Sequence, residues 1–400
     1  MTLSRALDFT VSGIEEHHLR VAVIALKLAN EINLSEQEKT TLFYSCLLHD
    51  AGVSSSKLRD KLKEFDFSDD AEHCEDGFIL LMRYPPLEKM AHAIRYHHDR
   101  WAGGNISGLS KQQIPLLSSI IHLADRIDIL IKKDTYVLEQ SDAVCEHINC
   151  YKGKYFRPDL VDCFNKLALI EAFWLDLVPG NTQDVLGKVH ETSRFVVDID
   201  TLMNLGEIFA SIIDNKSKFT RMHSRGVSSV AKETAKLFGL SEREVSMMSL
   251  AGLLHDIGKL SVPDEILDKS AKLTKQEFDI IKQHTFYTFH ILGKIDNFDE
   301  MNKWAAYHHE RLDGKGYPFR ISGYDMPIGA RIMAVSDTFT ALSEDRPYRK
   351  SQEKDMVVKI LDKEVEKRGL DGRIVNMVKD NYDSIHQAFE QAKNNNCYSD

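Results

Sequence analysis

Histidine and aspartate residues recur in the same order in the two halves of this 400-residue sequence. Imidazole and carboxylate groups bind divalent iron, manganese or zinc, so ordered sets of them on separate segments favour a metal centre. The C-terminal half offers seven such residues, including an aspartate that could bridge two metals: His223, His255, Asp256, His284, His308, His309 and Asp337. The N-terminal half carries the corresponding residues His17, His49, Asp50, His73, His97, His98 and Asp125.

The spacing within these two sets indicates a tandem duplication. The first His precedes the His-Asp pair by 32 residues in both halves, and the middle His precedes the His-His pair by 24 in both. The His-His pair precedes the last Asp by 28 residues in one half and 29 in the other. The separation between the His-Asp pair and the middle His differs by more than one residue, at 24 against 29. Because this order and spacing are hard to obtain by chance, we interpret the halves as two copies of one domain.

The segments that carry the candidate ligands are predicted to be helical. Each first His begins an amphipathic stripe at every fourth position: His17, Val21, Ala25 and Ala29, and His223, Val227, Ala231 and Ala235. The apolar runs LFYSCLLHD and MSLAGLLHD bring a His-Asp pair to the end of a buried helix, and Gly52 and Gly258 are interpreted as the stops of these helices. Adjacent helical residues point about 100° apart, so we expect the paired ligands at helix ends.

No alternating strand pattern of useful length occurs, and we predict an all-α fold. It consists of two tandem helical bundles joined by a helical linker, with a first domain over residues 1–181, the linker over 182–220 and a second domain over 221–400. The segments FRPDLVDCF and LDGRIVNMV are expected to begin equivalent helices late in each bundle.

The bulk composition excludes several classes of protein. The chain is long enough for two cores, and 43% hydrophobic with 28% charged residues is ordinary for a globular protein. We find no apolar run of about 18 residues and no secretion signal, so we expect no membrane span. Six cysteines without a CxxC pair are expected to be reduced thiols in the cytoplasm. The net charge of −10 argues against non-specific binding of DNA.

The C-terminal half resembles the HD superfamily of metal-dependent phosphohydrolases, and specifically its HD-GYP branch. The resemblance covers about residues 214–350 and rests on DNKSKFTRMHSRGV, LLHDIGK, HHERLDGKGYP and AVSDTFTALSEDRPYRK. Members of this branch are bacterial phosphodiesterases that linearise cyclic di-GMP, and some act on cyclic GMP-AMP. The resemblance therefore implies hydrolysis of a cyclic dinucleotide to the linear dinucleotide, with the choice between cyclic di-GMP and 3',3'-cyclic GMP-AMP left open.

The resemblance also implies a role for each candidate residue. One metal would be bound by His223, His255 and Asp337 and a second by His284, His308 and His309, with Asp256 bridging them. Lys259 would bind phosphate and act with Asp256 in catalysis, and Asp313, Gly314 and Arg346 are assigned to substrate binding. Some members have a Glu four residues before the first His that recruits a third metal. Phe219 stands there in this chain, so we expect two metals, iron or manganese.

The N-terminal half departs from this pattern and is interpreted as a degenerate HD-type domain. Val53 stands at the position of Lys259, Ala102 stands at that of Asp313, and no GYP follows. These losses predict that the half no longer handles substrate. Its seven candidate ligands could hold a metal or form hydrogen bonds with one another, and both alternatives stay open.

Two other functions compete with a cyclic-dinucleotide phosphodiesterase. One is a catalytically silent HD-type module that senses a nucleotide or docks a partner; the complete C-terminal ligand set and Lys259 argue against it. The other is hydrolysis of a mononucleotide, against which the GYP loop and the RPYR run argue. The sequence leaves open whether the chain is a monomer or a homo-oligomer.

Overall fold

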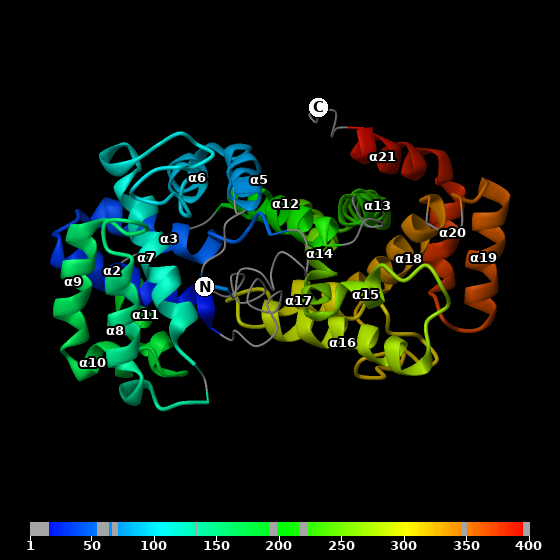
Figure 1. Cartoon of the computed structure of the whole chain (residues 1–400). Helices are drawn as coiled ribbons and strands as arrows, with labels where there is room; N and C mark the ends of the chain where they lie inside the picture. Colours follow the sequence, from blue (N-terminus) through cyan, green and yellow to red (C-terminus); the bar gives the residue numbers. More distant parts are fainter. Residues whose placement is uncertain are drawn as a thin grey trace. The chain divides into compact units, whose positions relative to one another are not determined.

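In the computed structural model the chain divides into two compact units, of which one ends at Val196 and the other begins at Val197. The structure describes residues 16–53, 64–65, 71–132, 134–191, 198–216, 222–345 and 350–394. Within these ranges the regular structure is helical (Figure 1), and the β-pairing is limited to an isolated bridge between Lys152 and Phe156. The predicted all-α class with two tandem bundles is confirmed.

The first unit is built from nine α-helices and three short 3-10 helices in the described part of the chain. The α-helices are α2 (His17–Glu31), α3 (Glu36–Leu48), α5 (Ala71–Met82), α6 (Glu88–Arg95), α7 (Leu116–Leu130), α8 (Ser141–Cys150), α9 (Pro158–Ala168), α10 (Glu171–Leu175) and α11 (Asn181–Glu191). The 3-10 helices are η1 (Pro85–Leu87), η2 (Lys111–Gln113) and η3 (Val137–Glu139).

The second unit repeats the order of the first in its central helices. Its elements are α12 (Ile199–Asn215), α13 (His223–Phe238), α14 (Glu242–Leu254), η4 (Ile257–Ser261), α15 (Asp264–Leu267), α16 (Lys275–Leu292), α17 (Asp299–Ala306), α18 (Ile328–Ser343), α19 (Lys354–Glu366), α20 (Gly372–Asp380) and α21 (Tyr382–Asn394). Helices α2, α3, α5, α6 and α7 thus correspond to α13, α14, α16, α17 and α18.

The segment predicted as a linker contributes one helix to each unit. Helix α11 packs on α2 in the first unit, whereas α12 packs on α13, α14 and η4 in the second. The segments expected to begin late helices do so, since FRPDLVDCF leads into α9 and LDGRIVNMV into α20. These two helices also contact the corresponding central helices, α2 and α13.

The helix that carries the first His is the centre of each bundle. Helix α2 packs on α3 and α7, and α13 packs on α14 and α18. The predicted stripes are buried in both copies; Ala25 and Ala231, for example, have no exposed surface. Small side chains along these stripes let the neighbouring helices approach, and the first His of each stripe is therefore held inside the bundle.

Both copies start the following helix with the same cap. Ser35 and Glu38 form a capping box at the beginning of α3, and Ser241 and Glu244 form one at the beginning of α14. In each, the serine hydroxyl accepts from the glutamate backbone N–H at 3.3 Å and the glutamate carboxylate accepts from the serine N–H. Both helices are 13 residues long from this common start and end directly before the His-Asp pair.

Gly52 and Gly258 do not stop helices, as the sequence suggested. Helices α3 and α14 already end at Leu48 and Leu254, and Gly258 lies inside η4. A Cβ atom on Gly258 would lie 1.9 Å from the carbonyl oxygen of His284, and one on Gly52 would lie 2.1 Å from that of His73. Glycine is needed here because the backbone of the next helix passes in contact, which brings the middle His to the His-Asp pair.

Two expectations from composition can be compared with the structure. Among the described helices, none combines the length and apolarity that crossing a membrane requires. The cysteines within the described ranges are free thiols, as predicted; Cys397 lies outside the described residues.

A buried carboxyl group ties α12 to the first turn of α13. The Ser224 hydroxyl donates to Oδ1 of Asp214 at 2.7 Å, directly beside His223. Asp214 is 1% exposed, and burial raises the pKa of its carboxyl to about 7. An acid whose pKa is higher in the folded than in the unfolded state destabilises the fold progressively as pH rises from about 4 through 7.

We expect Asp214→Asn to become more stabilising, relative to wild type, as pH rises. Asparagine keeps an acceptor for Ser224 but cannot ionise. The free energy of unfolding of the variant, relative to that of wild type, should therefore increase by about 2–3 kcal/mol between pH 5 and pH 8. Chemical denaturation at the two pH values measures the free energy of unfolding. Asp200→Asn, an exposed position on the same helix, is the control. An Asp214→Asn effect independent of pH would show that the carboxyl is already ionised in the fold.

Candidate functional site

The histidines of the C-terminal set are oriented by backbone carbonyl groups of their own segments. Nδ1 of His255 contacts the Gly252 carbonyl at 2.8 Å, Nδ1 of His284 that of Ile281 at 2.6 Å, and Nδ1 of His308 that of Ala305 at 2.6 Å. A carbonyl only accepts, so each Nδ1 must carry the proton. Each Nε2 is therefore left with a lone pair, which is the state that binds a metal ion.

The His-Asp and His-His pairs lie at helix ends, as predicted. His255 is the C-cap of α14, and His308 and His309 follow the end of α17. The last carbonyls of a helix lack a partner within it, so a histidine placed there finds its acceptor locally. The middle His284 instead lies within α16.

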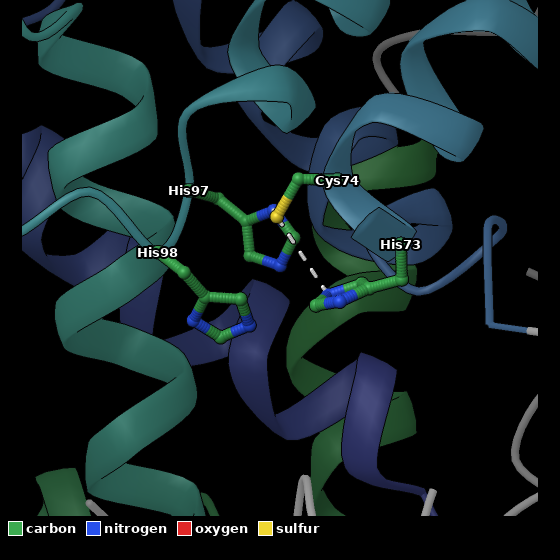
Figure 2. A group of neighbouring side chains, drawn as sticks. All are labelled: His73, Cys74, His97 and His98. Atoms are coloured by element: carbon green, nitrogen blue, oxygen red, sulfur yellow. Dashed lines mark hydrogen bonds between the residues drawn. The ribbon is translucent and has the colours of Figure 1, made fainter. Parts of the chain in front are cut away.

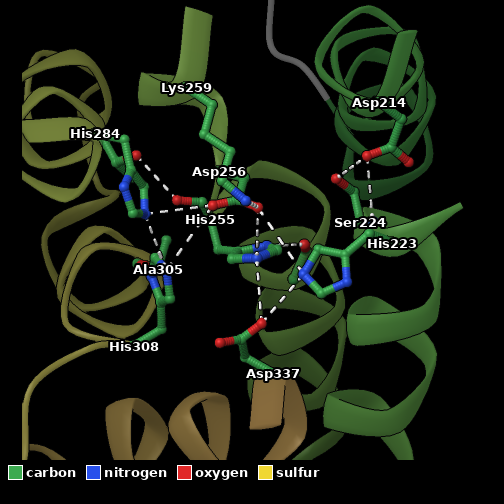
Figure 3. A network of polar contacts seen from close by, with 12 residues as sticks. Asp214, His223, Ser224, His255, Asp256, Lys259, His284, Ala305, His308 and Asp337 are labelled. Carbon is green, nitrogen blue, oxygen red and sulfur yellow. Dashed lines mark hydrogen bonds and ion pairs between the residues drawn. The ribbon is translucent and has the colours of Figure 1, made fainter. Parts of the chain in front are cut away.

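Asp256 lies between two groups of imidazoles (Figure 3). Its Oδ2 is 3.3 Å from Nε2 of His255 and 3.9 Å from that of His223, whereas its Oδ1 is 3.4 Å from Nε2 of His284. Burial alone would raise the pKa of Asp256, but His255 and Lys259 hold it well below its usual value. An ionised carboxylate with one oxygen toward each group is the arrangement of a bridging ligand.

The first His of the set is held by carboxylates at both ring nitrogens. Nε2 of His223 is 3.1 Å from Oδ1 of Asp337, and Nδ1 is 3.0 Å from Oε2 of Glu344. Burial lowers the pKa of His223, but Glu344 and Asp337 outweigh it and raise the pKa to about 10. Glu344 therefore positions His223 with its Nε2 toward Asp256 and Asp337.

The donor atoms are close enough to bind cations. Candidate ligand atoms of His223, His255 and Asp256 lie within 4.8 Å of one another, as do those of His284, His308 and His309. Nε2 of His255 and Oδ1 of Asp256 are buried and form no hydrogen bond. Leaving such groups unpaired costs about 1–3 kcal/mol each. A cation would satisfy them, so the residues present fit a metal centre.

A cavity of about 940 Å³ opens onto these ligands. Its wall includes Asp256, His309 and Asp337 from the centre, the aromatic rings of Phe278 and Tyr317, and four lysines: Lys259, Lys269, Lys272 and Lys275. The Lys259 ammonium forms an ion pair with Asp256, and Lys269 is bound by the Glu277 carboxylate at 2.6 Å. Lysine side chains thus outnumber the carboxylates on the wall of the cavity that opens onto the candidate metal ligands.

The loop after the His-His pair supports one wall of this cavity. Asp313 accepts from the Lys315 N–H at 3.0 Å, and Gly314 adopts a φ of 70°, so both residues shape a turn. Asp313 and Gly314 are not among the residues that line the cavity; Tyr317 is, with its ring 4.9 Å from that of His309. Arg346 and Phe219 lie outside the described residues.

The first unit brings its own set together in a similar way. Nδ1 of His49 contacts the Cys46 carbonyl at 2.8 Å and Nδ1 of His97 that of Ile94 at 2.6 Å. Asp50 lies 3.5 Å from Nε2 of His49 and 3.9 Å from that of His73. His17 lies 3.4 Å from Asp125, and His98 packs on His97 with ring centroids 4.1 Å apart. All seven predicted positions therefore converge.

The surroundings of the first unit's set are different. Asp125 is paired with Arg126 at 2.6 Å, and Asp128 accepts from both His17 at 2.7 Å and Arg20. The adjacent cavity, of about 690 Å³, is lined by four carboxylates and two guanidinium groups: Glu72, Glu75, Asp76, Asp99, Arg95 and Arg100. This cavity is predominantly acidic, whereas that of the second unit is basic.

Several residues of the two centres were missed from the sequence. Asp128 and Glu344 both hold the first His but lie three and seven residues after the last Asp, so no shared spacing marks them. His18 and Cys74 adjoin predicted ligands and have no His or Cys at the corresponding positions of the second half. In the sequence, only their positions directly after His17 and His73 could have indicated that they belong to the site.

Comparisons with known proteins agree with this geometry. Family models described as HD domain match residues 14–130 and 207–374. The chain is 32% identical to 3'3'-cGAMP-specific phosphodiesterase 1 of Vibrio cholerae, over 96% of this chain and 91% of that protein. It is 28% identical to 3'3'-cGAMP-specific phosphodiesterase 3 of the same organism, over 90% and 89%.

The chain is also similar to a relative over a shorter stretch and to a solved structure over nearly its whole length. A cyclic di-GMP phosphodiesterase of Thermotoga maritima is 38% identical over 38% of this chain and 41% of its own length. The crystal structure of a cyclic GMP-AMP specific phosphodiesterase of V. cholerae superimposes with a TM-score of 0.67 and 25% identity, covering 98% of this chain and 96% of that one. The similarity to the full-length relatives thus includes both units.

We expect Asp256→Ala to lose bound metal while keeping its helical fold. The substitution removes a carboxylate whose two oxygens face the two imidazole groups, Oδ2 toward His255 and Oδ1 toward His284, but little apolar packing. Elemental analysis of the full chain would measure metal per protein, and circular dichroism would measure helix content. Asp279→Ala, an exposed aspartate on α16, should change neither. A folded Asp256→Ala protein with unchanged metal content would contradict the bridging assignment.

Proposed function

This chain belongs to the HD-domain phosphohydrolase family of cyclic-dinucleotide phosphodiesterases, and we propose that its second unit is the catalytic one, hydrolysing 3',3'-cyclic GMP-AMP to the linear dinucleotide. The observation that carries the proposal is the buried, ionised Asp256 between two imidazole groups at the end of a lysine-lined cavity. The two relatives that match over nearly their whole length are both named as specific for 3'3'-cGAMP. The match to the cyclic di-GMP enzyme named above covers 38% of this chain.

Two divalent cations, iron or manganese, would be held by the ligand set. His223, His255 and Asp337 would bind one, His284, His308 and His309 the other, and Asp256 both. Bound cations supply Lewis-acid charge for the phosphodiester and a source of hydroxide near neutral pH. Buried imidazoles suit this role because burial lowers the pKa of His284 to about 3, and that of His308 well below its ordinary value, which keeps both rings neutral.

The cavity is lined by side chains that suit an anionic substrate with aromatic bases. A cyclic dinucleotide carries two phosphodiester charges, and Lys259 is the lysine paired directly with a candidate metal ligand. Lys259 is positioned to contact the scissile phosphate, and the exposed Lys272 and Lys275 on the cavity wall to attract the molecule. The rings of Phe278 and Tyr317, with centroids 6.3 Å apart, offer apolar faces for the bases.

The first unit is proposed to be regulatory or architectural. Val53 replaces the lysine, and the four carboxylates of its cavity would repel a phosphodiester. Its imidazoles converge as in the second unit. The units therefore differ in the residues that would bind the phosphodiester, which are lysines in the second unit and are absent from the acidic cavity of the first.

A panel of nucleotides tests the proposed reaction. Full-length protein reconstituted separately with iron and manganese would be assayed on 3',3'-cyclic GMP-AMP, cyclic di-GMP, linear dinucleotides and mononucleotides. We expect 3',3'-cyclic GMP-AMP to be converted to the linear product with the highest kcat/KM. Preference for cyclic di-GMP would overturn the base assignment. Hydrolysis of mononucleotides alone, or of nothing, would overturn the function.

We expect Lys259→Ala to lower kcat by about 100-fold or more without loss of metal. The lysine acts on the phosphate, and loss of a single charged group that stabilises the transition state typically costs about 10²–10³ in rate. Metal content measured beside the rate separates this role from a structural one. Lys303→Ala, an exposed lysine on α17, is the control. Joint loss of metal and rate would show that Lys259 maintains the site instead.

A pair of double variants tests which unit is catalytic. His49→Ala with Asp50→Ala should retain hydrolysis, whereas His255→Ala with Asp256→Ala should be inactive. The reason is that only the second unit combines the ligand set with a lysine and a basic cavity. Turnover of both proteins at saturating substrate is the measurement. An inactive first variant together with an active second one would reverse the assignment.

A further inference from the structure

A cysteine joins three histidines in the interior of the first unit. His73 and Cys74 lie on α5, and His97 and His98 follow the end of α6 (Figure 2). The ring centroid of His73 lies 5.2 Å from that of His97 and 5.0 Å from that of His98. Cys74 is 2% exposed, and its sulfur lies 3.8 Å from Nε2 of His73 and 3.4 Å from Nδ1 of His97. The four side chains therefore form one compact buried cluster.

The distances suit a single small cation. One potential ligand atom from each of the four residues lies within 4.8 Å of the other three. Zinc binds imidazole nitrogen at about 2.0–2.1 Å and thiolate sulfur at about 2.3 Å. Tetrahedral ligands at these lengths are separated by about 3.3–3.6 Å. Binding therefore needs the ligand atoms to move closer together by side-chain rotation, with the Cys74 sulfur turning from Nδ1 toward Nε2 of His97.

Two of the imidazoles have buried nitrogen atoms without a hydrogen-bond partner. Nδ1 of His97 donates to the Ile94 carbonyl, so its Nε2 is the acceptor. Nε2 of His97 and Nε2 of His98 are buried and form no hydrogen bond. Buried acceptors are normally satisfied, and a cation is the partner that would satisfy both at once. This observation is independent of the presence of the cysteine.

The second unit has no sulfur at the corresponding place. Thr285 follows the middle His there, and its hydroxyl donates to the Lys282 carbonyl within α16. No cysteine occurs between residues 197 and 394. Thiolate and imidazole together favour zinc over iron(II) or manganese(II), whereas imidazole and carboxylate accept the latter. Both units have a carboxylate beside the middle His, Asp50 in the first and Asp256 in the second, so the added sulfur is what shifts the first unit toward zinc.

The cluster also has a route that suits a cation. Cys74 and His98 line the cavity of about 690 Å³ together with four carboxylates and two guanidinium groups. One of the carboxylates, Glu75, is paired with Arg95 at 2.8 Å. The excess of negative charge attracts a divalent cation and repels a phosphodiester.

We propose that His73, Cys74, His97 and His98 bind a thiophilic divalent cation, zinc foremost, at a site distinct in chemistry from the centre of the second unit. Its place in the unit without a lysine-lined cavity makes it a structural or metal-responsive site. This proposal rests on residues of the first unit alone and does not depend on whether the second unit hydrolyses a cyclic dinucleotide.

Cobalt(II) substitution in the full chain tests the sulfur ligand directly. A thiolate bound to cobalt(II) gives an intense charge-transfer absorption in the near ultraviolet, which histidine and carboxylate ligands do not give. We expect this band in wild type and in Cys46→Ala, and its loss in Cys74→Ala. Cys46 is a matched control because it is equally buried in the same unit. Absence of the band in wild type, or its survival in Cys74→Ala, would overturn the proposal.

Zinc affinity gives the second readout and guards against misfolding. Cys74→Thr copies the residue of the second unit and keeps the side-chain volume. In competition with a chromogenic chelator, this variant should bind zinc about tenfold more weakly or worse. Its helix content and its hydrolytic rate with manganese should remain at wild-type level. Unchanged zinc affinity in folded Cys74→Thr would remove Cys74 from the ligand set.

Discussion

Both metal-ligand sets depend on a short hydrogen bond between an imidazole and a backbone carbonyl three residues earlier. His49, His97, His255, His284 and His308 all make this contact through Nδ1. It determines the tautomer, orients the ring and directs Nε2 inward, all before any cation arrives. Because most of these carbonyls are at helix ends, the position at which each helix stops decides where the ligand atoms meet.

The two units share this framework and differ in the charge around it. In the second unit the ionised Asp256 lies next to Lys259, and further lysines line the cavity. In the first, arginines are paired with Asp125 and Asp128, while carboxylates dominate the cavity. A phosphodiester and a free cation experience opposite fields in the two places. The two units thus differ more in the charge around their cavities than in the convergence of their histidines.

Much of this arrangement follows from the sequence because ligand spacing and helical periodicity are local properties. The fold class, the buried stripes and the placement of His255 and His308 at helix ends could all be predicted. Glu344 could not, because its contact with His223 depends on how the end of α18 lies over α13, and Asp128 reaches the equivalent His17 from a different position. Two lysines of the cavity, Lys269 and Lys272, lie in the segment between α15 and α16, whose path no periodicity describes.

Gly52 and Gly258 show the same limit. In a sequence, a glycine that ends a helix cannot be distinguished from a glycine at a close contact between two backbones. Gly258 and Gly52 each face the carbonyl of a middle His at a distance that leaves room for a hydrogen atom only. Any other residue adds a carbon there, so a substitution at either position would displace the backbone of the next helix although neither glycine carries chemistry. The first unit has Val53 where the second has Lys259 and yet keeps the adjacent Gly52. The backbone contact that brings its histidines together therefore does not depend on the lysine.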